Sequence, residues 1–354
     1  MLLIAVSCNP TAKKTNTLSS DSSNEKAREK KVYASQVIPF FDQWKLILGD
    51  GSNAGIATNF ENKEFFYTAN EGTSEWVVFK SPNGGDTHGT SNNTRTELAQ
   101  IKKWYPKTAN DKLTATLKVM NVSATGDARV AASHSVVVGQ IHSADGHENE
   151  PLKIFYKKFP DHSKGSVFWH YEINTAGDDN SGRWDFSTAV WGHDFSVVGS
   201  EENSSPEEPE DGIKLGEEFS YEIEVKEGIM NLKFMSEGHE TKTFTKNLVA
   251  SEYTGKQDIP DQTEKLFVPI GQDGVERENA YAGEGCFFKL GCYNQTNGKS
   301  PDVNKNWCSG AETHGGDIKK QYADGNYAEV WFKTGSINVS AAAVSNEGYF
   351  TKND

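Results

Sequence analysis

The chain of 354 residues is acidic, with 36 Lys and Arg against 50 Asp and Glu and a formal net charge of −14. This charge argues against a nucleic-acid-binding protein, because such proteins present a basic face to phosphates. An anionic ligand remains compatible with it if cations gather locally in a cleft. Hydrophobic residues make up 35% of the chain, and 19 Phe, 12 Tyr and 8 Trp supply enough apolar surface for a core, so disorder throughout is not expected.

The N-terminus, MLLIAVSC, is a short apolar run that ends in small residues and Cys8. It is too short to span a bilayer. It is similar to the end of a bacterial lipoprotein signal, in which the cysteine carries the lipid; a late-placed start in an ordinary secretory signal and a chance match are the alternatives. We expect residues 1–31 to be a signal remnant and solvated tether, residues 32–354 to be one domain, and the protein to be an envelope lipoprotein or secreted.

If Cys8 is lipidated, three cysteines remain, at Cys286, Cys292 and Cys308. An oxidising envelope would allow one disulfide. We favour a Cys292–Cys308 bridge, because it would constrain the loop between them. Three buried thiols are the alternative.

Short runs of alternating or β-branched residues, separated by turn signals, recur along the chain and predict strands. Convincing long amphipathic helices and internal repeats are not visible, so the pattern predicts an antiparallel β-sandwich. The segments at 177–183, 199–212, 251–284 and 296–321 are expected to be long loops, which are usually functional or mobile. The predicted strands cover residues 64–69, 76–80, 112–122, 133–142, 152–156, 166–173, 218–225, 230–234, 241–246, 286–295 and 328–333.

The segment at 286–295 places polar residues on one face of a single strand, because side chains point to alternate faces. The opposite face, with two cysteines, Phe288 and Leu290, predicts a core surface. The polar face is formed by Phe287, Lys289, Gly291, Tyr293 and Gln295.

Two other strand segments have a similar polar face. Arg95 and Glu97 share a face in RTELA, with Leu98 pointing inward, and Gln140 and His142 share a face in GQIH. Alone, an isolated QIH is more often structural than catalytic, and an Arg-x-Glu pair is usually a surface ion pair of small energy.

Together the three segments resemble the alginate lyases of polysaccharide lyase family 7, whose hallmarks are R[ST]EL, Q[IV]H and YxKxGxYxQ in that order. The likeness runs from FDQWKL at 41–46 to DGNYAEV at 324–330 and covers essentially everything after the tether. It implies an all-β fold, a β-jelly roll sandwich of two antiparallel sheets whose concave sheet forms a substrate groove. The expected partner is alginate, an acidic polysaccharide, with no nucleic acid, no membrane contact beyond a lipid on Cys8, and a monomeric state.

The resemblance also implies the site. Arg95, Gln140, His142 and Tyr293 would be catalytic, and Glu97, Lys289 and Gln295 would bind substrate around them. β-Elimination removes the C5 proton of a uronate and expels the 4-linked sugar, so the carboxylate that takes up the developing charge must be neutralised. A guanidinium and an amide suit that task. No metal or redox cofactor is expected.

The proton-transfer roles remain open between two residues. Tyr293 can protonate the leaving oxygen, and it can take the C5 proton if a cation such as Lys289 or Arg95 stabilises its phenolate. His142 is either the base or a group that orients the substrate. In the family, as the resemblance implies, Tyr serves both roles on mannuronate, and His is the base on guluronate.

The sequence departs from the family pattern at two positions. The second Arg of RSELR is Ala99, which removes a cation from the groove and puts affinity or subsite preference in doubt. The first Tyr of YxKxGxYxQ is Phe287, which keeps the ring and loses a hydroxyl. In the family that the sequence resembles, Ile in place of Val in this motif is associated with guluronate-containing substrates, so Ile141 slightly favours them here. Endolytic and exolytic action both remain open.

Other functions are weighed against this one. A glycoside hydrolase needs two positioned carboxyl groups, whereas the candidate active strands offer only Glu97; Glu222 and Glu224 share a face that is more simply solvent-exposed. A non-catalytic carbohydrate-binding protein could use Trp169, Trp184 or Trp191 as platforms, although these residues more often anchor a core or a loop. A lyase acting on another polyuronate is a further alternative.

A zinc site from His142, His147 and Glu148 is also conceivable. Their spacing is not that of a helical HExxH motif, and the segment around them, SADGHENEP, is typical of a loop. We therefore do not expect it.

Overall fold

The computed structural model describes residues 31–89, 91–144, 150–173, 184–195, 206–249, 281, 283–304 and 307–340. The chain contacts divide it into Met1–Lys31 and a compact unit, Val32–Asp354, to which all the elements below belong. Cys8 and residues 9–30 of the expected tether lie outside the described residues. Within the described part, no helix has both the length and the apolar character needed to cross a membrane.

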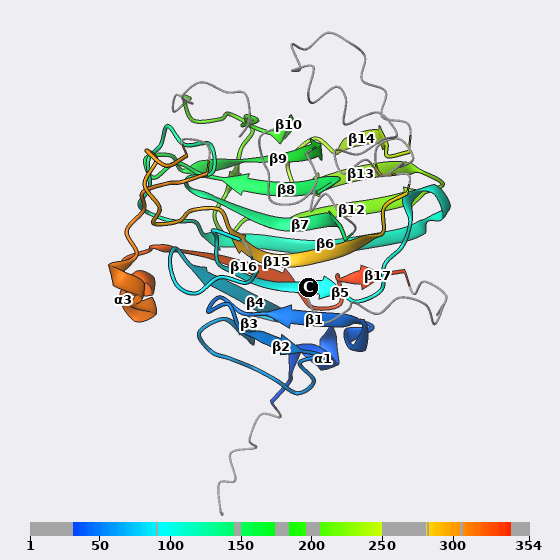
Figure 1. The fold of residues 1–354 in the computed structure, drawn as a ribbon, viewed down its shortest axis with the longest axis horizontal. Coiled ribbons are helices and arrows are strands. Elements are labelled where there is room, and N and C mark those ends of the chain that lie inside the picture. The colour runs from blue at the N-terminus through cyan, green and yellow to red at the C-terminus, as the bar shows by residue number, and fades with distance from the viewer. Residues whose placement is uncertain are drawn as a thin grey trace, which may run out of the picture. The chain divides into compact units, whose positions relative to one another are not determined.

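The first sheet is antiparallel and carries the candidate site. Its strand order is β10-β9-β8-β7-β15-β5-β1-β2, with β11 paired to β9 (Figure 1). The strands are β1 (Trp44–Ile47), β2 (Asn53–Gly55), β5 (Arg95–Gln100), β7 (Ser135–Ser143), β8 (Leu152–Lys157), β9 (Lys164–Ile173), β10 (Trp184–Trp191), β11 (Ile213–Lys214) and β15 (Cys286–Asn294).

The second sheet is also antiparallel, with the order β14-β13-β12-β6-β16-β4-β3 and β17 paired to β6. Its strands are β3 (Phe66–Glu71), β4 (Ser74–Pro82), β6 (Asn110–Asn121), β12 (Phe219–Lys226), β13 (Ile229–Ser236), β14 (Lys242–Asn247), β16 (Tyr327–Lys333) and β17 (Asn338–Val339). The described helical turns are short: α1 (Ala34–Val37), α3 (Ile318–Ala323), η1 (Phe41–Gln43), η2 (Pro106–Thr108) and η5 (His314–Gly316).

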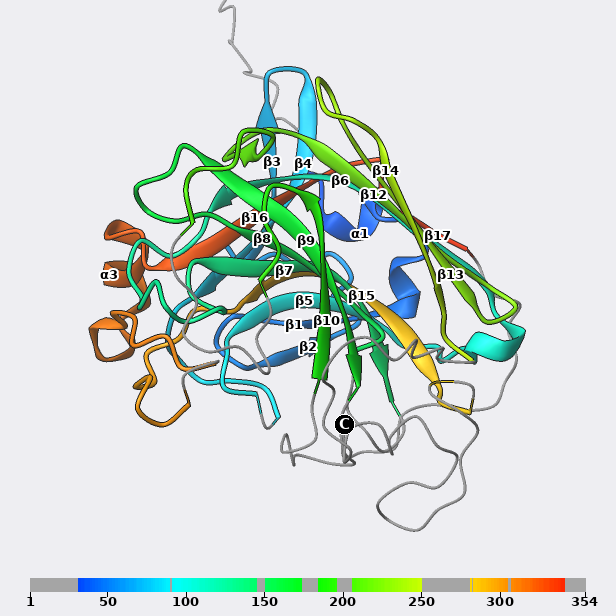
Figure 2. The ribbon, with the colours of Figure 1, turned by 90° about the horizontal axis from the view of Figure 1, so that it is seen from above.

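The two sheets lie as layers with the main apolar core between them (Figure 2). In β12, FSYEIEVK alternates buried and partly exposed residues along most of its length, as expected for a strand with one face on a core. Its buried residues meet Leu98, Ile141 and Leu290 of the first sheet in the same cluster. Burial of such side chains stabilises the fold by roughly 1.5–3 kcal/mol each.

The predicted all-β sandwich of antiparallel sheets is confirmed. Each of the eleven predicted strands exists, and no boundary differs by more than two residues. The sequence analysis did not predict β1, β2, β10 or the two-residue strands β11 and β17. The expected loop at 296–321 contains η5 and the start of α3.

The predicted Cys292–Cys308 disulfide is wrong, because both cysteines, like Cys286, are buried thiols. Strand alternation points Cys292 into the main core, where it is 0% exposed. Cys308 lies outside that core cluster, in the segment after β15. The alternative of three buried thiols is the one observed.

Candidate active site

Three adjacent strands, β5, β15 and β7, bring the predicted polar residues onto one face of the first sheet. Residues paired across antiparallel strands point to the same side. The core residues Leu98, Ile141 and Leu290 alternate with them and face the other sheet. The pairs are Arg95 with Tyr293, Glu97 with Gly291, Gln140 with Lys289 and His142 with Phe287.

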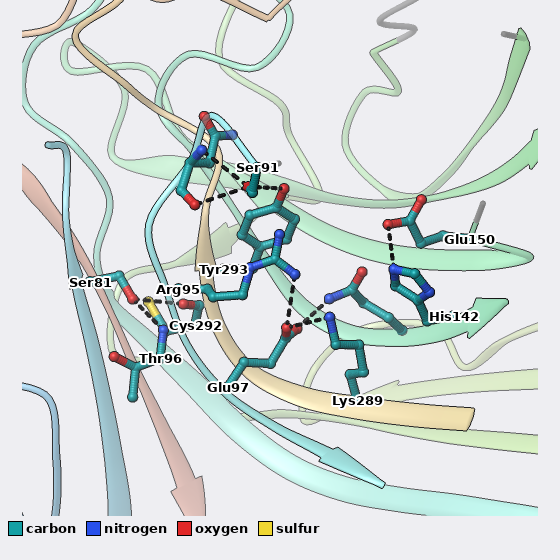
Figure 3. Close-up of polar contacts among 12 residues, drawn as sticks. Ser81, Ser91, Arg95, Thr96, Glu97, His142, Glu150, Lys289, Cys292 and Tyr293 are labelled. Carbon is teal, nitrogen blue, oxygen red and sulfur yellow. Dashed lines mark hydrogen bonds and ion pairs between the residues drawn. The ribbon is translucent and has the colours of Figure 1, made fainter. Parts of the chain in front are cut away.

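Glu97 is the hub of this face (Figure 3). Its carboxylate accepts a hydrogen bond from Nε2 of Gln140 and lies 2.9 Å from Nζ of Lys289 and 3.5 Å from Nη1 of Arg95. Burial alone would raise the pKa of Glu97, but the two cations and the bonds from Lys289 and Gln140 lower it below its ordinary value. The ionised carboxylate therefore fixes three side chains at once.

Two of the side chains held by Glu97 have a further polar atom that makes no hydrogen bond. Among the described residues, Oε1 of Gln140 and Nε of Arg95 are buried without a hydrogen-bond partner. Buried polar atoms without a partner are uncommon and call for an explanation. A polar ligand at this face would supply one.

Lys289 lies beneath the same surface, with 7% of the residue exposed. Burial lowers its pKa to about 8, although the neighbouring Glu97 opposes the shift. The ammonium group is therefore mostly protonated at neutral pH and adds positive charge under the site.

The ring of Tyr293 lies between a cation and an apolar cluster. The guanidinium carbon of Arg95 is 3.8 Å from the ring centroid, and Oγ of Ser91 is 3.1 Å from the phenol oxygen. Tyr293 also packs against the cluster that contains Val137 and Phe155 on the same face of the sheet. These contacts hold the ring against the guanidinium and the hydroxyl at Ser91.

The imidazole of His142 is oriented on two sides. Its Nδ1 lies 2.5 Å from the carbonyl oxygen of Ser143, so the proton is assigned to Nδ1 and Nε2 keeps its lone pair. Phe287 stacks on the ring, with centroids 5.1 Å apart and planes 22° apart. Burial lowers the pKa of His142 to about 4, against the raising effect of Glu150. The ring is therefore a neutral base at neutral pH.

Glu150 was missed by the sequence analysis. Its Oε1 lies 3.6 Å from Nε2 of His142, and its Oε2 lies 3.1 Å from Nζ of Lys153. Lys153 also lies 3.0 Å from the carboxylate of Glu172. No motif marks Glu150, because its approach to His142 depends on how the chain returns into β8.

A group of residues with metal-ligating side chains lies farther along the same sheet. Ligand atoms of His170, Glu172 and Asp185 lie within 4.8 Å of one another. The ammonium of Lys153 already neutralises Glu172, and Nδ1 of His170 is 3.6 Å from Asp185. The group thus extends the ion-pair network that begins at Glu150. His147 and Glu148 of the zinc alternative lie outside the described residues.

Gln295 occupies a different place from the other predicted residues. It follows the last residue of β15, and its Nε2 donates to the carbonyl oxygen of Tyr293 at 3.3 Å. Its backbone N–H donates to Ser135. The contacts of Gln295 therefore close the strand end. The pairing of β15 with β7 shifts register between Leu290 and Tyr293. Its pairing with β5 is continuous from Lys289 to Tyr293, so these two residues stay on one face.

Ala99 has a lysine on each side in the sheet. Its cross-strand partners are Lys45 on β1 and Lys289 on β15. The burial of His88 lowers its pKa, and Arg95, Lys45 and Lys289 lower it further, so these three cations lie near one another. The face around Ala99 is thus cationic despite the acidic net charge of the chain.

Most of the residues considered for a carbohydrate-binding protein or a glycoside hydrolase lie away from this face of the first sheet. Trp169 and Trp191 are buried in the main core, and the side chain of Trp184 lies outside the described residues. Glu222 lies on β12 of the second sheet, where it pairs with Lys112 at 2.7 Å, and Glu224 on the same strand is also partly exposed. Glu97 is held by three donors, which suits an anchor better than the acid of a hydrolase.

Comparison with known proteins agrees with this geometry. The family model described as "Alginate lyase" matches residues 38–339. A solved structure of the exolytic PL7 alginate lyase AlyA5 from Zobellia galactanivorans is 62% identical, with a TM-score of 0.76 over 88% of this chain and 99% of that one.

Two matches come from Klebsiella pneumoniae. A curated alginate lyase is 27% identical over 280 residues, which cover 70% of this chain and 76% of the relative. A solved alginate lyase structure is 21% identical, with a TM-score of 0.58 over 88% of this chain and 99% of that one, and supports the fold. The chain belongs to the alginate lyases of polysaccharide lyase family 7.

Proposed function

We propose that this alginate lyase uses Arg95, Gln140, His142 and Tyr293 to cleave 1,4-linked uronates by β-elimination. A base takes the C5 proton, the C4–C5 double bond forms, and the bond from C4 to the linking oxygen breaks. The oxygen leaves with a proton from an acid. The product carries a 4,5-unsaturated sugar at its new non-reducing end.

The cross-strand register of β5, β15 and β7 is the observation that carries this proposal. It puts a guanidinium, an amide, an imidazole and a phenol on one face. Arg95 neutralises the substrate carboxylate as charge moves onto it, and Gln140 stabilises it through the second N–H of Nε2. Glu97 fixes both side chains before substrate arrives. Pre-fixed donors need no reorganisation during the reaction.

His142 is assigned as the base and Tyr293 as the acid. The neutral imidazole has a free lone pair on Nε2, and Glu150 nearby stabilises the imidazolium that forms. Tyr293 carries a proton that it can give to the leaving oxygen. On mannuronate, whose C5 proton lies on the other face of the ring, Tyr293 is the alternative base.

The ultraviolet absorbance of the unsaturated product tests the reaction. Purified protein on alginate should give rising absorbance together with new reducing ends. New reducing ends without absorbance would indicate hydrolysis and would overturn the proposal.

Within alginate, we propose a slight preference for guluronate-containing blocks. His142 as base and Ile141 in the QIH motif support it, although Ile141 faces the core and acts only through its neighbours. Initial rates on polyguluronate, polymannuronate and mixed blocks test this. Faster turnover of polymannuronate would contradict it.

We further propose exolytic cleavage. The 62%-identical Zobellia galactanivorans enzyme is exolytic, and the match covers 99% of its chain. A product time course should show small products from the first minutes. Early long oligomers would instead indicate internal cutting.

We also propose that Cys8 anchors the protein to the cell envelope through a lipid. The residues before it, MLLIAVS, support this reading. The full chain should partition into detergent, and Cys8→Ser should partition into the aqueous phase. Equal partitioning of both proteins would refute the anchor.

A further inference from the structure

Ser91 lies at the hydroxyl of Tyr293, the proposed acid (Figure 3). Its Oγ is 3.1 Å from the phenol oxygen, 3.0 Å from the carbonyl oxygen of Asn93 and 3.2 Å from the N–H of Asn93. A serine hydroxyl has one proton to donate and two lone pairs to accept with. Ser91 therefore donates to the Asn93 carbonyl, and it accepts from the Asn93 N–H and from the phenol O–H.

The loop that carries Ser91 is held against the end of β15. Nδ2 of Asn93 donates to the carbonyl oxygen of Gln295 at 3.3 Å, and Nδ2 of Asn297 donates to Oδ1 of Asn93 at 2.6 Å. Both asparagines are at most 5% exposed. The position of Ser91 is therefore set by buried bonds to the same chain segment that carries Tyr293.

We propose that Ser91 is a positioning residue that holds the phenol proton at rest and stabilises the phenolate after proton transfer. The inference rests on the proposed acid role of Tyr293. At rest, the phenol O–H is directed at Ser91, which fixes the side chain in one orientation.

A serine hydroxyl can both accept and donate a hydrogen bond, so Ser91 can change from acceptor to donor when Tyr293 loses its proton. When the bond from C4 breaks, the phenol O–H bond also breaks, its proton goes to the leaving oxygen, and Tyr293 becomes a phenolate. The O–H of Ser91 turns from the Asn93 carbonyl to the phenolate oxygen, giving a charge-assisted hydrogen bond in place of a neutral one. The guanidinium of Arg95, 3.8 Å from the ring centroid, is already on the ring face. Before the next turnover, His142 releases the C5 proton to water and the phenolate of Tyr293 takes a proton from water.

A matched pair of variants tests the inference. Ser91→Thr keeps the hydroxyl, and Ser91→Val introduces a side chain of nearly the same shape as threonine but without the hydroxyl. Loss of a charge-assisted bond predicts a roughly ten- to hundredfold lower kcat for Ser91→Val, with KM and Tm near wild type. Ser91→Thr should keep kcat within about threefold of wild type, since its hydroxyl can make the same bonds.

Wild-type kcat in Ser91→Val would overturn the inference. If Ser91→Val and Ser91→Thr both lose kcat, Ser91→Ala is the deciding variant, because it removes the hydroxyl without added bulk. A low kcat with unchanged KM and Tm in Ser91→Ala supports the role. A wild-type kcat in Ser91→Ala excludes it. Tyr293→Phe is measured in parallel. If Tyr293→Phe stays active, the proposed acid role fails; if it is inactive while Ser91→Val and Ser91→Ala are normal, only the Ser91 inference fails.

Discussion

The carboxylate of Glu150 lies 3.6 Å from Nε2 of His142, the nitrogen that is left without a proton by the bond from Nδ1 to Ser143. A carboxylate at this place favours the imidazolium over the neutral ring. Base strength at His142 is therefore a balance between burial, which lowers its pKa to about 4, and Glu150, which opposes that shift.

Glu150→Gln should move the acid limb of the pH–rate profile to lower pH. The base works when neutral, so wild-type kcat/KM should fall as pH drops through about 4. Removing the charge lowers the pKa of His142 further and weakens stabilisation of the imidazolium, so we expect a roughly tenfold lower plateau. Glu222→Gln, the same substitution on the second sheet, should leave the pH–rate profile unchanged. An acid limb that stays in place in Glu150→Gln would argue against His142 as the base.

Arg95→Ala should lose both rate and affinity, because in the proposed mechanism the guanidinium contacts the substrate carboxylate before and during the reaction. The expected loss in kcat/KM is on the order of 10²–10³-fold. Arg95→Lys keeps the charge without the planar fork and should lie in between. Steady-state kinetics on alginate measure both variants, and a KM change with unchanged kcat would mean that Arg95 only binds.

Gly291→Ala should disrupt the site through the backbone. Gly291 has φ +149, and a Cβ there would lie 2.5 Å from the carbonyl oxygen of Thr96 and 2.8 Å from Cα of Glu97. We expect a loss of about 1–3 kcal/mol from strain alone, together with displacement of Glu97 and low activity. Gly216→Ala, at φ +80 with open space around it, isolates the conformational cost. Urea unfolding and kinetics separate the two effects; normal activity in Gly291→Ala would contradict the close approach.

Lys157→Met should destabilise the protein without touching the chemistry. The buried ammonium donates to the carbonyl oxygens of Ala131, at 3.0 Å, and Ser133. Leaving these carbonyl oxygens without a donor should lower the unfolding free energy by about 2–4 kcal/mol. Lys233→Met, which alters an exposed lysine on β13, should stay within about 0.5 kcal/mol of wild type.

The same lysine predicts a pH dependence of stability. Burial lowers the pKa of Lys157 from 10.5 to about 7, so between these values the unfolded chain binds more protons than the folded one. This difference makes the wild-type unfolding free energy rise with pH across that window. Lys157→Met should lack the rise; an equal slope in both proteins would contradict the assignment.

Alternating apolar residues made most strands predictable, as FSYEIEVK in β12 illustrates. The four-residue WKLI of β1 is too short and too apolar to show alternation, and WDFSTAVW of β10 mixes polar residues into a strand beside a segment expected to be a loop. Their pairing with β5 and β9 is a tertiary effect that local pattern does not contain.

The candidate site was predictable where it follows strand alternation. Period-two reasoning put the polar residues on a shared face within each segment, and the family resemblance implied that the segments form one site. Cross-strand register brings together Arg95, Glu97, Gln140, His142, Lys289 and Tyr293. Glu150 and Ser91 could not be found this way, because each reaches its partner from outside a strand. Gln295 closes the strand end instead of extending the face, because it follows the last residue of β15 and its Nε2 donates back to the carbonyl oxygen of Tyr293.

Tyr293→Phe tests the central claim most directly, because it removes one hydroxyl and leaves the ring under Arg95. Product absorbance on alginate and oligosaccharide binding by calorimetry should be measured on the same preparation. The account predicts no detectable absorbance and nearly unchanged binding. Elimination at a near-normal rate in this variant would contradict it.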